Sequence, residues 1–149
     1  MSLRQKIRER MIPIENYATI TPKSTLREAA LSLRKSFCEL DSGMRTAAGP
    51  RTVLVTDKND SLVGVLDFRC FLENYFPQIG GLSEKLKVND IMLKVKGTID
   101  ANASMEDGFK TIVQKKLSVL PVYDGDKAVG LIRDTDIFLA ITENLEEGN

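Results

Sequence analysis

The sequence predicts an α/β fold built from two copies of one β-α-β-β-α unit. One observation is that a series of short patterns occurs twice, in the same order, along the 149 residues. A second is that each copy passes from apolar residues at helical spacing to short runs typical of β-strands. A unit of about 60 residues buries too little surface to be stable alone. We therefore expect the two copies to pack sheet to sheet, related by pseudo-twofold symmetry.

The repeated patterns set the expected domain boundaries. The second copy contains the patterns Val88–Met92, Thr98–Asn102, Ser104–Gly108, Leu120–Asp124, Val129–Ile132 and Asp136–Ile137. The first copy contains Ile7–Met11, Thr19–Lys23, Thr25–Ala29, Val53–Asp57 and Leu62–Leu66. More residues separate the helix from the next strand in the first copy, which predicts a loop insertion at about 38–51. The expected division is a first domain at 1–76, a linker at 77–86 and a second domain at 87–146.

Each copy begins with a short extended segment followed by a helix. The extended segments are 18–21 and 97–100. Ser24 or Thr25, and Ser104, precede the helices as N-cap candidates, with an acidic residue three positions further on in the manner of a capping box. Apolar residues then recur at helical spacing: Leu26, Ala29, Ala30, Leu33 and Phe37 in the first copy, and Met105, Phe109, Ile112 and Val113 in the second.

Two strands and a closing helix complete each copy. The expected strands are 53–56 and 62–66 in the first copy, and 119–123 and 128–132 in the second. The residues between them are rich in Asp, Asn and Gly, which favours hairpin turns. The closing helices are expected at 68–75 and 135–144. The segment 77–81, with one proline and two glycines, separates the copies.

Composition excludes several functional classes. Lys and Arg together equal Asp and Glu at 21 each, whereas nucleic-acid binding usually requires a basic excess. The longest apolar runs reach five residues, as at 137–141, against about 20 for a membrane span. The N-terminus has no apolar stretch that would make a signal peptide. We expect a cytoplasmic protein with no nucleic-acid partner and no membrane insertion, in which Cys38 and Cys70 are reduced thiols.

The chain contains no histidine. This removes Ser-His and Cys-His nucleophile pairs and the commonest transition-metal ligand. Two isolated cysteines do not form a tetrahedral zinc site without further ligands, and the sequence has no phosphate-binding loop of the Gly-x-x-x-x-Gly-Lys-Ser/Thr type. The sequence therefore predicts a protein that is not an enzyme and has no metal or resident cofactor.

The ordered series of patterns resembles the CBS domain, the family named from cystathionine beta-synthase. The resemblance follows Val88-x-Asp90-Ile91-Met92, Leu120-Pro121-Val122 and Val129-Gly130-Leu131-Ile132 with Asp136. It is close in the second copy and weaker in the first, and the two together cover nearly the whole chain. It implies a tandem CBS pair, also called a Bateman module, that forms a homodimer. It also implies a ligand containing adenosine: AMP, ADP, ATP or S-adenosylmethionine.

The resemblance also implies which residues bind this ligand. The family's ribose motif, Gly-apolar-apolar-Ser/Thr-x-x-Asp, falls on Gly130 to Asp136, with Arg133 at the Ser/Thr position. An ionised carboxylate accepts hydrogen bonds from both ribose hydroxyls. The other copy's first extended segment is expected to complete the cleft, so the binding residues implied are Asp136, Arg133, Leu131, Ser118, Val119, Leu120, Pro121, Tyr17, Ala18, Thr19 and Ile20. The segment 118–121 is expected to supply backbone hydrogen bonds and apolar walls to an adenine ring.

Structural explanations of the same residues stay open. Asp136 also fits the first turn of the last helix, where the helix dipole favours an acid by less than about 1 kcal/mol. Val119 to Val122 also fits a core strand. Arg133 fits three roles: holding a phosphate, filling the cleft, or pairing with Asp134.

The first copy departs from the ribose motif at both polar positions. Asp67 stands at the Ser/Thr position and Cys70 at the Asp position. A thiol is a weak acceptor, and Asp67 would repel a phosphate, so whether this cleft binds anything stays open.

Two functions remain in competition. The first is a regulatory module that binds an adenosine-containing ligand and signals to a partner protein. The alternative is a ligand-free structural module for dimerisation or docking. In either case we expect a homodimer built on apolar helical residues: Leu33, Phe37, Phe109, Val113, Phe138 and Leu139.

Overall fold

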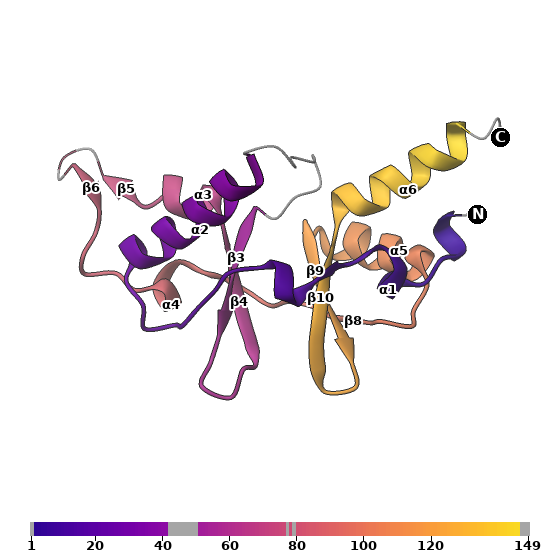
Figure 1. The fold of residues 1–149 in the computed structure, drawn as a ribbon, viewed down its shortest axis with the longest axis horizontal. Coiled ribbons are helices and arrows are strands. Elements are labelled where there is room, and N and C mark those ends of the chain that lie inside the picture. Colours follow the sequence, from indigo (N-terminus) through magenta and orange to yellow (C-terminus); the bar gives the residue numbers. More distant parts are fainter. Residues whose placement is uncertain (1, 42–50, 77, 79, 147–149) are drawn as a thin grey trace. The chain divides into compact units, whose positions relative to one another are not determined.

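The structure is a computed structural model that describes residues 2–41, 51–76, 78 and 80–146. It divides into two compact units (Figure 1). Unit 1 contains the chain up to Glu15 and from Lys96 onward, and unit 2 contains Asn16–Val95.

Unit 2 is built on a four-stranded sheet of order β2-β3-β4-β7. Its elements, in chain order, are β2 (Thr19–Ile20), α2 (Leu26–Asp41), β3 (Thr52–Thr56), β4 (Leu62–Asp67), α3 (Phe68–Leu72), β5 (Tyr75–Phe76), β6 (Gly81–Leu82), α4 (Val88–Ile91) and β7 (Leu93–Lys94). β2 runs parallel to β3, and β3, β4 and β7 are antiparallel to their neighbours. β5 and β6 form a separate antiparallel pair.

Unit 1 is built on the corresponding sheet, of order β1-β10-β9-β8. Its elements are η1 (Ser2–Arg4), α1 (Ile7–Arg10), β1 (Ile12–Pro13), η2 (Ile14–Asn16, whose last residue falls in unit 2), β8 (Ile99–Asp100), α5 (Met105–Lys115), β9 (Val119–Asp124), β10 (Lys127–Arg133) and α6 (Asp134–Glu146). β8 is parallel to β9, and β9, β10 and β1 are antiparallel. The two units therefore share one topology, which confirms the predicted α/β fold with two repeats.

The segment that opens each sequence repeat packs into the opposite unit. Ile7 of α1 is fully buried in the core of unit 1, although it opens the first copy, which otherwise forms unit 2. Val88 of α4 is fully buried in the core of unit 2, although it opens the second copy. The backbone hydrogen bonds match as well: Ile7 N–H donates to the Ala103 carbonyl, and Val88 N–H to the Ser24 carbonyl.

The compact units consequently differ from the expected division at 1–76 and 87–146. The sequence repeat shows where equivalent elements begin, but contacts decide which sheet they complete. β1 adds an edge strand to β10, with Ile12 opposite Leu131, and β7 adds one to β4, with Leu93 opposite Val65. The chain thus runs between the units twice, once near residue 15 and once near residue 95.

Two equivalent glycines make room for these edge strands. A Cβ atom at Gly130 would lie 2.6 Å from the Ile12 carbonyl oxygen and 2.7 Å from the Met11 sulfur. A Cβ atom at Gly64 would lie 2.6 Å from the Met92 sulfur. Only glycine permits so close an approach. The glycine that opens the repeated motif therefore has a packing role in both units.

The expected caps are present. Ser104 Oγ accepts a hydrogen bond from the Asp107 N–H at 3.1 Å. Thr25 and Glu28 form both bonds of a capping box, at 3.1 and 3.0 Å. These caps satisfy backbone donors that a helix leaves without internal partners.

Some details differ from the sequence-based expectations. The closing helix of the first copy ends at Leu72, not at Tyr75, because Tyr75 pairs with Leu82 in the β5–β6 hairpin. Leu33 is 3% exposed within the core of unit 2, so it is not available to a dimer interface. The side chain of Phe37 and most of the predicted insertion at 38–51 lie outside the described residues.

Candidate functional site

Asp136 follows β10 in the first turn of α6 and is 6% exposed. Among the residues whose burial the structure describes, it is the one charged residue that is buried. Burying a carboxylate is costly unless it is paired and hydrogen-bonded. The partner of this carboxylate therefore decides what the site can do.

The partner is Arg133, the residue at the Ser/Thr position of the motif. Its Nη2 donates to Asp136 Oδ1 at 2.6 Å, and its Nε donates to Oδ2 at 2.9 Å. Its backbone N–H also donates to Oδ2, at 2.9 Å. The two side chains are 13% and 8% exposed, so this is a buried, bidentate ion pair.

This geometry bears on two sequence-based interpretations. Arg133 forms an ion pair with Asp136, whereas Asp134 is exposed and its N–H donates to the Ser118 carbonyl. The structural role of Asp136 also exceeds a helix-dipole contribution, because its carboxylate both caps the first turn of α6 and neutralises a buried guanidinium.

The strand residues of the predicted site lie beside this pair in unit 1. Val119 stands directly opposite Arg133 in the β9–β10 ladder, and Leu131 stands opposite Pro121. Leu120 is fully buried in the core of unit 1, and its expected contact with a ligand stays a prediction. Pro121 and Leu131 are also buried, and alternation places them on the other face of the sheet.

The remaining predicted site residues belong to unit 2. Thr19 and Ile20 form β2, and the Ala18 carbonyl accepts from the Leu54 N–H at 2.9 Å. Tyr17 is 7% exposed. Their expected approach to Asp136 stays a prediction.

The equivalent site of the first copy has the opposite arrangement. Asp67 is the N-cap of α3, and its Oδ1 accepts from the Cys70 N–H at 3.1 Å. In unit 1 the carboxylate belongs to Asp136, three residues after Arg133, and it accepts a hydrogen bond from the Arg133 backbone N–H. Cys70 is buried, and burial raises the pKa of its thiol to about 11. The first copy therefore places a neutral thiol where the second places a carboxylate.

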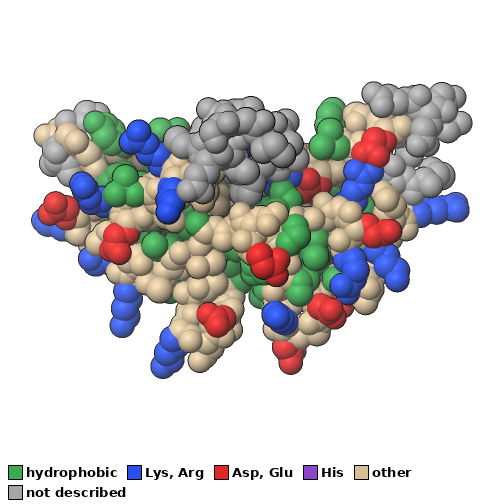
Figure 2. Space-filling model, viewed as in Figure 1, with side chains coloured by type: hydrophobic (Ala, Val, Ile, Leu, Met, Phe, Trp, Pro, Cys, Tyr) green, Lys and Arg blue, Asp and Glu red, His purple; other side chains and the backbone are tan. Residues whose placement is uncertain are grey.

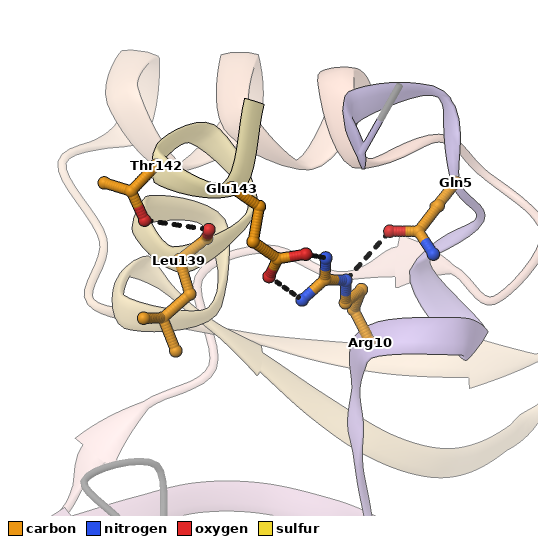
Figure 3. A network of polar contacts seen from close by, with 5 residues as sticks. All are labelled: Gln5, Arg10, Leu139, Thr142 and Glu143. Carbon is orange, nitrogen blue, oxygen red and sulfur yellow. Dashed lines mark hydrogen bonds and ion pairs between the residues drawn. The ribbon is translucent and has the colours of Figure 1, made fainter. Parts of the chain in front are cut away.

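Sequence reasoning missed a second ion pair that fixes α6 (Figure 3). Arg10 of α1 forms two hydrogen bonds with the Glu143 carboxylate, one of them at 2.7 Å, and Gln5 accepts from Arg10 Nε at 2.9 Å. The hydrogen bond from Arg10 lowers the pKa of Glu143. The separation of the two residues along the chain left no sequence signal for this pair.

Three further features of the described residues concern metal ligands, helix length and surface charge. The described residues contain no group of three or more side chains that would hold a metal ion. Within the same part of the chain, no helix has the length and apolar character needed to cross a membrane. Basic and acidic side chains are interspersed on the face drawn in Figure 2.

Residues 88–143 match the family model for the CBS domain, while a comparison with curated proteins gave no match. Solved structures share the fold. An uncharacterized conserved protein from Pyrococcus horikoshii is 15% identical, with a TM-score of 0.71 over 95% of each chain.

Two further structures of the same fold contain nucleotides. The CBS domain of a bacterial CNNM/CorC family Mg²⁺ transporter in complex with ATP is 20% identical, with a TM-score of 0.74 over 94% of this chain and 89% of the other. CBSX2 in complex with AMP is 20% identical, with a TM-score of 0.65 over 93% of this chain and 96% of the other. At these identities the likeness is one of fold.

Proposed function

Because residues 88–143 match the family model for the CBS domain and the chain has the fold of CBS-domain proteins, we propose that this protein is a regulatory module that binds an adenosine-containing ligand. Binding is passed on to a partner protein, and the module itself is not catalytic. A cytoplasmic location belongs to the same proposal.

The buried carboxylate of Asp136 carries the proposal. It stands directly after β10, at the acidic position of the motif, and is held in place by a backbone hydrogen bond from Arg133. A fixed, ionised acceptor binds a ribose diol through charge-assisted hydrogen bonds, which are about twice as strong as neutral ones. The complexes of two structural relatives with ATP and AMP add support.

Calorimetric titration with AMP, ADP, ATP and S-adenosylmethionine tests the proposal. We expect saturable binding of at least one of them, and a loss of about tenfold or more in affinity for Asp136→Asn, since hydrogen bonds to charged groups contribute about 1.5–3 kcal/mol. Asn keeps the side-chain shape, and circular dichroism checks the fold. Asp134→Asn, which removes an exposed carboxylate from the same helical turn, is the matched control and should bind as the wild type does. Absence of binding by all four compounds would refute the proposal.

A second candidate is a ligand-free module for dimerisation or docking. Two observations favour it. Arg133 already occupies both carboxylate oxygens of Asp136. Unit 1 also exposes apolar side chains on α5 and α6, namely Phe109 (38%), Val113 (59%), Phe138 (63%) and Leu139 (43%).

Dimerisation through these helices is compatible with both candidates. Exposed apolar patches of this kind mark interfaces. Light scattering at tens of micromolar protein tests for the homodimer. The Phe138→Ser variant should contain a larger fraction of monomer than the wild type does. A strict monomer of 16.6 kDa would exclude this assembly. A dimer that binds none of the four compounds would favour the second candidate.

A further inference from the structure

The carboxylate of Asp136 has few free acceptor positions. An ionised carboxylate offers about four lone-pair positions. Arg133 uses three of them: Nη2 on Oδ1, and Nε together with the backbone N–H on Oδ2. A ribose diol donates two hydrogen bonds and needs two acceptor positions. The diol therefore binds only after the guanidinium gives up at least one of its bonds.

Releasing the guanidinium separates opposite charges that are 13% and 8% exposed. Separation of a buried pair is unfavourable because each group gives up an opposite charge where water is scarce. A ligand that brings its own anion offsets this loss, since phosphate accepts the planar guanidinium fork as a carboxylate does. Adenosine has no such group. S-adenosylmethionine carries one carboxylate, but its sulfonium and ammonium groups leave it with a net positive charge, which a guanidinium repels.

We propose that Arg133 is a specificity-determining residue that restricts this site to nucleotides with an anionic phosphate group, because only an anion releases Asp136 for the ribose. This inference rests on the proposed function. It selects AMP, ADP and ATP over adenosine and S-adenosylmethionine. The buried ion pair is the closed state of the site, and the exchange of carboxylate for phosphate on Arg133 opens it.

The test compares wild type with Arg133→Ser in calorimetric titrations with AMP, adenosine and S-adenosylmethionine. Serine removes the guanidinium but keeps the backbone N–H of residue 133, which donates to the Asp136 carboxylate at the start of α6. The wild type should bind AMP at least about tenfold more tightly than the other two compounds. In the variant, adenosine should gain about tenfold in affinity and AMP should gain less, so that the preference shrinks.

Arg8→Ser is the matched control. It removes one positive charge from unit 1 at a side chain that is 41% exposed and pairs with Asp124 at 3.3 Å. It should leave the preference for AMP unchanged. Arg133→Lys is a second variant in case serine destabilises the fold. An ammonium keeps the charge but cannot form the bidentate pair, so adenosine should gain affinity to an intermediate degree.

The outcomes separate the two proposals. If adenosine binds wild type as tightly as AMP does, or gains nothing in either Arg133 variant, the role of Arg133 is refuted while the proposed function stands. If wild type and both variants bind none of the compounds, the proposed function fails and this inference fails with it.

Discussion

Removing either member of the Arg133–Asp136 pair should destabilise the protein more than removing both. Asp136→Ala leaves a guanidinium that is 13% exposed without its carboxylate, and it deletes the hydrogen bond that caps α6. Breaking a buried pair in this way costs about 3–5 kcal/mol. Arg133→Met should cost less, because the carboxylate keeps the backbone N–H. Replacing a whole buried pair is often close to neutral.

A double-mutant cycle measures this coupling. Urea unfolding followed by circular dichroism gives the free energies of unfolding of wild type, Asp136→Ala, Arg133→Met and the double variant. We expect the double variant to lose roughly 2–3 kcal/mol less in free energy of unfolding than the two single variants lose together. The same cycle on the exposed pair of Arg8 and Asp124 should give coupling near zero, because exposed ion pairs contribute little. Additivity at Arg133 and Asp136 within about 0.5 kcal/mol would refute the reasoning.

Two further predictions concern unit 1 outside the ion pair. Gly130→Ala should lower the free energy of unfolding by about 1–3 kcal/mol, because the new methyl group would overlap β1. Gly81→Ala, which meets nothing within 4 Å, should change it by less than about 0.5 kcal/mol, and equal effects in urea unfolding would contradict the packing role. The pKa of Glu143 is lowered in the folded state. Its ion pair with Arg10 therefore stabilises the fold fully above the unfolded pKa of about 4.3, and this stabilisation is lost as the pH falls through the lower folded pKa. Melting temperatures of wild type and Glu143→Gln should therefore differ at pH 7 and converge toward pH 3, and a constant difference would show that the ion pair is not responsible.

The sequence predicted the elements of each copy because their signals are local. Cap residues, helical spacing and hairpin turns act within a few positions, and Ser104 and the strands on either side of residues 125–126 appear where those signals lie. The assignment of α1 and α4 to units was not predictable in the same way. Ile7 and Val88 occupy equivalent places in the repeat, and nothing local shows that each completes the opposite unit.

The candidate site was predictable in position but not in state. The motif located Asp136 and the adjoining strand, and the family resemblance assigned them a ligand. The sequence left Arg133 three roles, and the one ion-pair partner that it offered was the adjacent Asp134. In the folded chain the carboxylate that is buried gains most from the charge. Burial, which depends on tertiary packing, therefore decided the pairing.

The two copies should differ in binding because their carboxylates occupy different positions of the motif. Asp67 is the N-cap residue of α3, whereas Asp136 lies within the first turn of α6. We expect one adenine nucleotide per chain. Asp67 accepts from the Cys70 N–H, and burial raises the pKa of the Cys70 thiol to about 11, further above neutral pH than that of an ordinary thiol. A neutral thiol is a weak acceptor for a diol, so the first copy lacks the group on which the proposal depends. Calorimetry with AMP should give a stoichiometry near one, and Asp136→Asn should weaken that single site. Two equivalent sites per chain, or binding that Asp136→Asn leaves unchanged while Asp67→Asn weakens it, would move the ligand to the first copy and remove the basis for a ribose site at Asp136.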